Sequence, residues 1–427
     1  MEYRNHYDVI VVGGGFAGCG AAIAAAEQGM SVLLVEASNA LGGAANVNLV
    51  NPFMRYYCIE KETRKVLKVL SRGIFERIVD ELEKMGGFLN KGTIYQSAVF
   101  HEEYLKLILN RMTTEAGVTL LFHAYLCDAE VSEGQIRSIE LATKSGKLTF
   151  SADCFIDATG DADLAALAGC PYRVGREEDG LCQPMTLCFR LGNVDIDHFL
   201  KEKPAINPLY QQWQAEGKIK NIRENVLVFR NVAPGVLHFN STRIVRRDPT
   251  NVFDVTQAEL DAREQVFELF DFLRTNFESF RNSELIATAT AIGVRESRMI
   301  DGLYVLTEED LKNCTMFADS IALGNYDIDI HNPAGSGTSH YYFEGLDHYS
   351  IPYRSLVPQK CDNLLVAGRC ISATHEAQAS IRIMPIVCCL GEAAGVAASL
   401  AVKHSLAPAD VNTDELRSIL TENGAAV

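Results

Sequence analysis

The stretch "VIVVGGGFAGCGAAIAAAEQGMSVLLVEA", residues 9–37, contains the pattern that decides the fold. It begins with four β-branched residues, Val9 to Val12, which predict a strand buried on both faces. A glycine loop follows, and then an alanine-rich run from Phe16 to Gln28 that predicts a helix. A second apolar run, Ser31 to Val35, predicts the next strand. The order of strand, glycine loop, helix and strand is typical of a dinucleotide-binding unit.

The glycines of this loop form the pattern G-x-G-x-x-G at Gly13, Gly15 and Gly18. The first permits the tight turn out of the strand, the second lets a pyrophosphate approach the backbone, and the third lets the helix pack closely. The helix then presents free N–H groups at Phe16 and Ala17 to an anion. Glu36 ends the second strand, where its carboxylate can accept hydrogen bonds from a ribose and would repel a 2′-phosphate. The loop alone leaves FAD and NAD open.

The composition and charge of the chain indicate which kinds of partner it can bind. The chain has 427 residues with a formal net charge of −16, so nucleic acid or an anionic membrane is not expected as a partner. We expect a small-molecule substrate, no transmembrane span and no signal peptide. Twelve cysteines occur without a C-x-x-C pair, which favours buried thiols in a cytoplasmic protein and no metal site. The adjacent Cys388 and Cys389 point apart on a helix, and Cys58 is left without a predicted redox role.

Further elements follow the first unit. We expect amphipathic helices over 71–85 and 102–116, a β-meander over about 118–150, a buried strand over 154–158 and a long helix over 256–280. The predicted organisation is an FAD-binding part over 1–171, an inserted α+β substrate domain over 172–349, a second FAD-binding part over 350–405 and a tail helix over 406–427.

The distant segments favour FAD over NAD. A contiguous NAD-binding domain needs nothing from residue 365 onward. Here a strand leads into "LLVAGRC", residues 364–370, and a long helix opens with Met384 and Pro385. A proline in the first turn leaves the remaining N–H groups free to face an anion, such as the N1–C2=O region of a reduced flavin.

These motifs resemble those of the FAD-dependent oxidoreductases related in fold to the glutathione reductase and fumarate reductase groups. The resemblance rests on "VVGGGFAG" with "VEASNALGG", "FIDATGDADLAALAG" with "GLCQPMTL", "GVRESRMIDGLYVLTEEDL", and the segment from "IPYRSLVPQ" to "GEAAGVAA". It covers about residues 7–402 and is thinnest over 192–257. It implies an α/β fold: a Rossmann-like FAD-binding domain of the glutathione reductase superfamily with an inserted substrate domain.

The same resemblance implies the cofactor-binding positions. The chain most resembles a bacterial subgroup known only as FAD-dependent oxidoreductases. Relatives outside this subgroup usually carry Gly-Asp where this chain has Gly368-Arg369, so Arg369 is a departure that adds a charge near the phosphate. The expected contacts are Gly13, Gly15, Phe16, Ala17, Gly18, Glu36, Ala37, Gly42, Gly43, Ala44, Ala158, Thr159, Gly160, Asp161, Gly368, Arg369, Met384 and Pro385. Because no histidine lies near "GGAANVNLV", where fumarate reductase relatives carry a covalent link, we expect noncovalent FAD.

Two polar clusters supply candidates for the chemistry. "YDIDIHNPAGSGTSHYYFEG" contains His331, and "GRCISATHEAQASIRIMP" contains His375 and Arg382, all three of which are candidate catalytic residues. Candidate substrate contacts are Arg295, His340 and Tyr342. A structural role is the alternative for each: a hydrogen-bonded core histidine, or, for the arginines, a buried ion pair.

The sequence therefore predicts an FAD-dependent oxidoreductase that transfers a hydride between FAD and a small polar substrate. The chain has a single G-x-G-x-x-G and no nicotinamide module, which favours substrate oxidation over reduction, with an unidentified electron acceptor or donor. The alternatives are a flavin-dependent reductase with a separate electron donor, a non-catalytic electron-transfer subunit, and a tRNA-modifying flavoprotein, which the acidic charge disfavours. A homo-oligomer is compatible with the sequence.

Overall fold

The fold is organised around a seven-stranded sheet in a computed structural model that describes residues 3–63, 65–89 and 98–427. Five strands pair in parallel in the order β7-β2-β1-β10-β21. They are β1 (His6–Val12), β2 (Val32–Val35), β7 (Thr119–Leu121), β10 (Gly146–Asp157) and β21 (Leu364–Val366). Strand β21 thus joins the sheet from a position far along the chain, as the segment "LLVAGRC" predicts.

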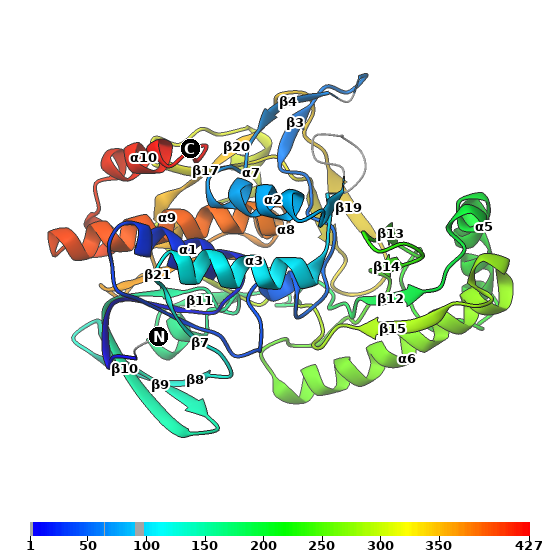
Figure 1. The fold of residues 1–427 in the computed structure, drawn as a ribbon, viewed down its shortest axis with the longest axis horizontal. Helices are drawn as coiled ribbons and strands as arrows, with labels where there is room; N and C mark the ends of the chain where they lie inside the picture. Colours follow the sequence, from blue (N-terminus) through cyan, green and yellow to red (C-terminus); the bar gives the residue numbers. More distant parts are fainter. Residues whose placement is uncertain (1–2, 64, 90–97) are drawn as a thin grey trace.

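Alternation along β1 divides the core into two layers. Val9 and Val11 pack into the apolar core that contains the helices α1 (Phe16–Glu27) and α9 (Met384–His404). Ile10 and Val12 pack into an apolar layer on the other face of the sheet, with β9 (Gln135–Thr143) and β10. A strand buried on both faces needs apolar residues at every position, which explains the unbroken run of the sequence. Figure 1 shows α1 and α9 side by side.

The expected meander forms, with one difference. Strand β8 (Tyr125–Ser132) pairs antiparallel with β9, and β9 pairs antiparallel with β10. Sequence analysis separates a strand that ends at Phe150 from a buried strand over 154–158. The structure contains one continuous strand, β10, because its first half pairs with β9 and its second half pairs with β1. Polar residues in the middle of β10, Ser151 and Asp153, interrupt the apolar pattern, so the sequence predicts two strands.

Glycines let α1 and α9 pack backbone against backbone. A Cβ atom on Gly391 would lie 1.9 Å from the carbonyl oxygen of Ala17, and one on Gly395 would lie 2.2 Å from that of Ala21. On the facing helix, a Cβ atom on Gly20 would lie 2.5 Å from the carbonyl oxygen of Cys388. The close approach locks the start of the chain to its last long helix. Both helix N-termini are thereby fixed relative to each other.

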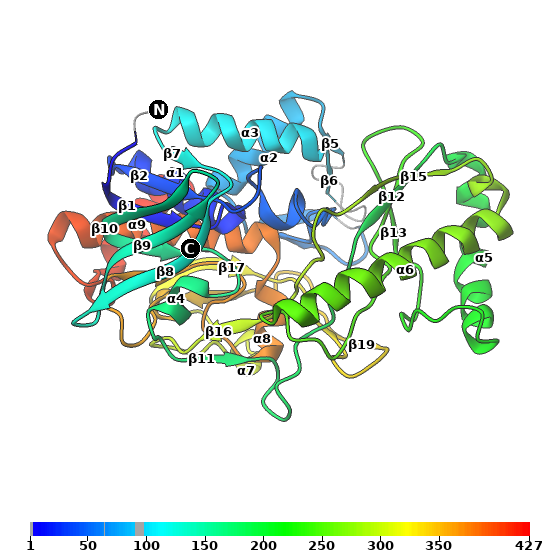
Figure 2. The same ribbon diagram turned by 90° about the horizontal axis from the view of Figure 1, so that it is seen from below.

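A second apolar core lies in the part of the molecule that extends away from the large sheet (Figure 2). Apart from Leu49, its buried residues run from Met185 to Ile292. They come from a four-stranded antiparallel sheet, β13-β14-β12-β15, and two long helices. The elements are β12 (Phe189–Gly192), α5 (Ile196–Ala215), β13 (Val228–Arg230), β14 (Leu237–Phe239), α6 (Val252–Asn276), η2 (Glu278–Phe280) and β15 (Glu284–Thr288).

The expected limits of the inserted domain, residues 172 and 349, remain predictions. The second apolar core covers a shorter part of the chain than these limits. Buried apolar residues between Leu306 and Tyr349, apart from Leu323, pack in the first core with α9 and not in the second. Helix α5 lies in the region of weakest resemblance and was not predicted from the sequence. Pro204 and Pro208 lie inside it and interrupt the helical pattern.

The remaining elements surround these two cores. They are η1 (Gly43–Ala45), β3 (Tyr57–Ile59), β4 (Val66–Val69), α2 (Ile74–Lys84), β5 (Phe88–Leu89), β6 (Val99–Phe100), α3 (Glu102–Glu115), α4 (Asp163–Leu167), β11 (Tyr172–Val174), β16 (Arg298–Ile300), α7 (Glu308–Lys312), β17 (Ser320–Gly324), β18 (Ile328–His331), β19 (Thr338–Tyr341), β20 (Tyr349–Pro352), η3 (Tyr353–Leu356), α8 (His375–Ile381), η4 (Pro408–Asp410) and α10 (Thr413–Glu422).

Helix α9 is long and apolar enough to cross a membrane by length and composition alone, which the sequence analysis did not anticipate. In the fold, 94% of its most apolar window is buried inside the protein, as in the core helix of a soluble protein. Its apolar surface therefore belongs to the first core.

Candidate functional site

The glycine loop lies at the carboxyl ends of β1 and β10. Gly13 has φ 102°, and a Cβ atom there would lie 2.4 Å from the carbonyl oxygen of Ala158. A Cβ atom on Gly18 would lie 1.7 Å from the carbonyl oxygen of Gly13. At Gly15, by contrast, a Cβ atom would meet no atom of the described residues within 4 Å. Gly13 and Gly18 are thus required by the fold, whereas Gly15 borders open space in which a ligand can approach the backbone.

The start of α1 faces that open space. Gly15 is its N-cap residue, and within the described chain no side chain caps this end and no acidic residue lies in its first turn. The side chains of Phe16 and Ala17 are buried, so these residues would reach an anion through their backbone N–H groups. An uncapped helix N-terminus with a glycine at its cap suits a phosphate group.

Glu36 stands at the end of β2 beside the loop. One carboxylate oxygen accepts a hydrogen bond from the Gly14 N–H (2.7 Å), and the other accepts from the Ser38 N–H (2.7 Å). These bonds hold the carboxylate in place next to half-buried Ala37. Each oxygen retains a second lone pair, so the group can still accept hydrogen bonds from ribose hydroxyls.

A second glycine turn borders the same space. Gly42 and Gly43 have φ values of 104° and 47° and lead into η1, which includes Ala44. The Gly42 N–H donates to the carbonyl oxygen of Gly14 (2.8 Å), and a Cβ atom on Gly43 would lie 2.9 Å from the Cα atom of Gly15. Backbone rather than side chain therefore lines this wall.

The end of β10 and the end of β21 meet at a half-buried ion pair. Arg369 donates to the carboxylate of Asp161 (2.6 Å), which also accepts from the Ser297 hydroxyl (2.5 Å). A Cβ atom on Gly160 would lie 2.6 Å from the Arg369 guanidinium, so glycine lets the arginine cross here. The neighbouring Thr159 hydroxyl donates to buried Asp157 (2.7 Å). Arg369 thus brings its charge to this edge already partly neutralised.

The start of α9 faces the interior of the molecule. Its N-cap is Ile383, followed by Met384 and Pro385 in the first turn, and among the described residues no side chain caps this end. The first turn likewise carries no acidic residue in the described chain. The uncapped N-terminus of a helix carries a partial positive charge, which stabilises negative charge nearby.

Three predicted residues of the chemistry converge on Asp329. Its carboxylate lies 3.3 Å from the His331 Nε2, 3.5 Å from the His340 Nδ1 and 3.8 Å from an Arg382 nitrogen, and it accepts from the Tyr326 hydroxyl (3.0 Å). Buried Asp329 has its pKa held well below the usual range: burial opposes the shift, but His331, Arg382 and His340 outweigh it. The aspartate is therefore a fixed negative charge.

His331 is held in one tautomer. An Arg243 guanidinium nitrogen donates to its Nδ1 (3.0 Å), so Nδ1 is the acceptor and Nε2 carries the proton that faces Asp329. Burial, reinforced by the charge of Arg295, lowers the pKa of His331 to about 3. Both ring nitrogens are thus engaged within the protein, and the imidazole is neutral.

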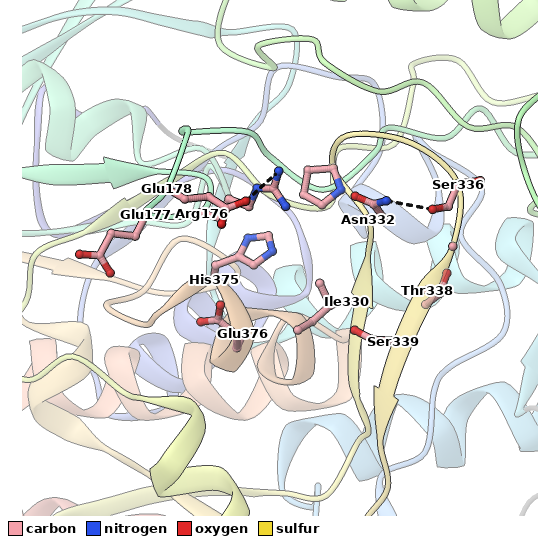
Figure 3. A pocket seen from close by; sticks show the side chains of 12 residues that line it. Arg176, Glu177, Glu178, Ile330, Asn332, Ser336, Thr338, Ser339, His375 and Glu376 are labelled. Carbon is pink, nitrogen blue, oxygen red and sulfur yellow. Dashed lines mark hydrogen bonds and ion pairs between the residues drawn. The ribbon is translucent and has the colours of Figure 1, made fainter.

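His375 has a different environment. Its Nδ1 lies 2.7 Å from a carboxylate oxygen of Glu296, a fully buried residue. The Nδ1 therefore donates and leaves Nε2 as the acceptor of the ring. Figure 3 shows the imidazole at a pocket of about 770 Å³ that is also lined by Glu376 and Ile330. Gln183 lies between the two histidines. Its backbone N–H donates to Glu296 (2.8 Å), and its side-chain oxygen accepts a hydrogen bond from the backbone N–H of His331 (3.5 Å).

Among the described residues, no carboxylate forms an ion pair with Arg295, which differs from the buried ion pair expected as its structural role. Its guanidinium donates to the Pro184 carbonyl and the Thr186 hydroxyl, both at 2.6 Å. Burial, together with the charges of Arg382 and Arg223, lowers its pKa to about 9. Of its neighbours in sequence, Glu296 binds His375, and Arg298 pairs with Asp163 (2.8 Å).

We call Arg223, Arg243, Arg295 and Arg382 the buried arginine cluster. Arg223 and Arg243 are 4% and 1% exposed, and Arg295 and Arg382 are half-buried. Sequence motifs predict Arg295 and Arg382 but not Arg223 and Arg243, which come from the loop before β13 and the loop after β14. No motif marks these two positions, since an isolated arginine in a loop is usually exposed to solvent.

The other candidates lie apart from this cluster. Tyr342 is 61% exposed and its ring stacks with that of His340, with centroids 5.4 Å apart. Cys58, Cys388 and Cys389 are buried free thiols, and burial raises the pKa of each. Among the residues that the structure describes, no group of histidine, cysteine and carboxylate side chains could hold a metal ion.

Comparison with known proteins gives a family match over most of the chain. Residues 8–420 match the model of a family described as FAD dependent oxidoreductase. Among solved structures, the chain is similar to a geranylgeranyl bacteriochlorophyll reductase-like protein from Thermoplasma acidophilum, with 12% identity, coverage of 98% of this chain and 84% of that one, and a TM-score of 0.47. It is also similar to p-nitrophenol 4-monooxygenase from Pseudomonas putida, with 10% identity, 99% and 82% coverage, and a TM-score of 0.44.

Proposed function

The chain belongs to the FAD-dependent oxidoreductase family, and from this premise we propose that it binds FAD noncovalently and oxidises a small polar substrate. The observation that carries the proposal is the backbone-lined space beside Gly15. An uncapped helix, a second glycine turn and the anchored carboxylate of Glu36 border this space. These are the donors and acceptors that a pyrophosphate and an adenosine ribose require. The noncovalent mode rests on the absence of histidine from residues 42–50 of the sequence.

The cofactor contacts follow from this arrangement. Gly13, Gly15 and Gly18, with the first turn of α1, would hold the pyrophosphate, and Glu36 would hold the adenosine ribose. Gly42 to Ala44 would lie along the ribityl chain and the flavin. Ala158 to Asp161 and Gly368-Arg369 would close the opposite side. Met384 and Pro385 would direct the N-terminus of α9 toward the flavin, as in a Rossmann-like fold of the glutathione reductase type.

When bound, FAD accepts a hydride from the substrate carbon; the protein must take the proton of the oxidised O–H or N–H group. We assign that proton to Nε2 of His375, because Glu296 fixes the tautomer with Nε2 as the acceptor. His331 is less suited, because Arg243 already donates to its only free lone pair. Its role is then to position Asp329 and, through it, Arg382. The direction of the reaction rests on the single G-x-G-x-x-G in the chain.

The test is anaerobic bleaching of the purified yellow protein with sugars, amines, hydroxy acids and NADH. We expect one of the first three classes to bleach the flavin and NADH to do so slowly or not at all. Rapid bleaching by NADH alone would indicate a reductase. No bleaching by any of these compounds would indicate an electron-transfer subunit. With the reactive class in hand, His375→Gln should lower the rate of bleaching about 100-fold or more.

A further inference from the structure

The buried arginine cluster contains more positive than negative charge. Glu224 pairs with Arg243 (3.0 Å), and Asp329 lies 3.8 Å from Arg382. For Arg223 and Arg295, no carboxylate of the described residues lies within 4 Å. His331 adds no charge because it is neutral. Four guanidinium groups and two carboxylates therefore leave two positive charges without a counterion inside the protein.

The cluster also has donors without acceptors. In the described part of the chain, the Nε atoms of Arg223, Arg243 and Arg382 are buried and have no hydrogen-bond partner. A buried charged donor that lacks a partner is costly, so a fold that keeps three of them close together has a reason to do so. An anion between these side chains would supply both the missing charge and the missing acceptors.

The position of the cluster links it to the proposed flavin site. Arg382 immediately precedes Ile383, the N-cap of α9. The Arg295 carbonyl accepts from the Gln378 side chain of α8 (2.8 Å), and the loop before Arg295 is tied to the loop after η1 by a hydrogen bond from Asn48 to Ala291 (2.9 Å). We place the start of α9 and the turn at η1 against the flavin. An anion held here would lie next to the reactive ring.

We propose that Arg223, Arg295 and Arg382 bind the carboxylate of a small organic acid, which is the substrate class of this enzyme. Arg295 is the central residue, because it is held by neutral partners and its charge is left for the ligand. The unpartnered Nε–H groups of Arg223 and Arg382 would supply hydrogen bonds that such a carboxylate accepts. The proposal rests on the proposed function, since it places the acid beside a bound FAD.

The experiment uses the yellow holoprotein at constant ionic strength. Acetate, succinate and benzoate are each titrated against the flavin absorption spectrum, and acetamide, succinamide and benzamide serve as neutral controls. We expect at least one acid to perturb the spectrum with a saturable Kd and its amide not to do so. The proposal is overturned if no acid perturbs the spectrum, or if each amide perturbs it as well as the acid.

Variants separate the cluster from the cofactor. Arg295→Met should weaken binding of the acid about 100-fold and Arg295→Lys about 10-fold, with the FAD content of both unchanged. Arg354→Met is the matched control: Arg354 is exposed and pairs with buried Asp319 (2.9 Å), and this variant should bind the acid as the wild type does. If Arg295→Met is insoluble, Arg382→Lys replaces it, with the same expected direction.

Two other outcomes are informative. If the Arg295 variants lose FAD while acid binding per flavin is unchanged, the cluster serves the flavin and the carboxylate proposal fails. If the wild-type protein binds no FAD at all, the proposed function fails first, and this proposal fails with it. A yellow protein that ignores every acid contradicts only the carboxylate site.

Discussion

The glycine loop and the buried arginine cluster are built in opposite ways. The loop, with the start of α1 and the turn at Gly42, is a surface of backbone groups drawn largely from one contiguous stretch. The cluster is a set of side chains from loops that lie up to 159 residues apart, from Arg223 to Arg382. A backbone site depends on where side chains are missing, and a side-chain site depends on how distant loops meet. The four predictions that follow test this difference.

The largest effect is expected where a side chain enters the backbone site. Gly15→Val adds a side chain whose Cβ atom would lie in the open space beside the helix N-terminus, with no described atom within 4 Å. We expect FAD binding to fall about 1000-fold, or about 4 kcal/mol, because the pyrophosphate can no longer approach the backbone. Fluorescence titration of apoprotein with FAD measures it. The apoprotein's thermal midpoint should stay near that of the wild type, and a large fall would mean that Gly15 serves the fold instead.

The cluster should respond in the reverse way, with a loss of stability but not of cofactor. Asp329→Asn removes the charge beside His331 and Arg382 and leaves buried guanidinium groups uncompensated. We expect the free energy of unfolding to fall by about 3 to 4 kcal/mol, which urea denaturation measures. FAD affinity of the folded variant should change less than about threefold. If stability is unaffected, the carboxylate is not what holds the cluster together.

Helix α9 serves both regions, and Glu392 in its interior gives it a pH dependence. Burial raises the pKa of Glu392 to about 7, although its carboxylate accepts from the Ile74 N–H at the start of α2 (3.0 Å). Below the unfolded pKa the residue is protonated in both states. As the pH rises through about 7, the folded state must carry a buried negative charge on Glu392. The stability that the protonated carboxyl contributes to the folded state is then lost.

Glu392→Gln should therefore stabilise the protein by up to about 3 kcal/mol at pH 8 and by little at pH 4.5. Urea denaturation of both proteins at the two pH values tests this. Equal stability of the variant and the wild type at pH 8 would show that the Ile74 hydrogen bond already offsets the cost of burial.

The smallest effect is expected at the ribose end of the backbone site. Glu36→Gln keeps one oxygen for the Gly14 N–H and places an amide where the Ser38 N–H needs an acceptor. We expect FAD affinity to fall about fivefold, or about 1 kcal/mol. Calorimetric titration of the apoprotein would show it. A loss as large as that of Gly15→Val would mean that the carboxylate, and not the backbone, dominates the site.

These differences explain how much could be predicted from sequence. The βαβ unit, the amphipathic helices and the return of residues 364–404 to the sheet follow from local patterns, and the structure contains them. Helix α5 was missed because two prolines interrupt its pattern. The single strand β10 was divided because its pairing partner changes halfway along.

The site divides in the same way. The positions around Gly15 follow from spacing, because each glycine is required by geometry within a few residues. His331, His340 and Arg382 were identified as polar residues in two segments, but their meeting at Asp329 depends on tertiary structure. Arg223 and Arg243 carry no local signal. Tertiary structure brings these two arginines to the cluster from the loop before β13 and the loop after β14.

The most direct test of the account is the flavin content of the purified protein before and after acid precipitation. We predict a yellow protein that releases about one FAD per chain into the acid supernatant, as a single noncovalent site requires. A flavin that stays with the precipitate would contradict the noncovalent site. A colourless protein that fails to take up added FAD would contradict the assignment of the glycine loop, and with it the roles of His375 and of the buried arginine cluster.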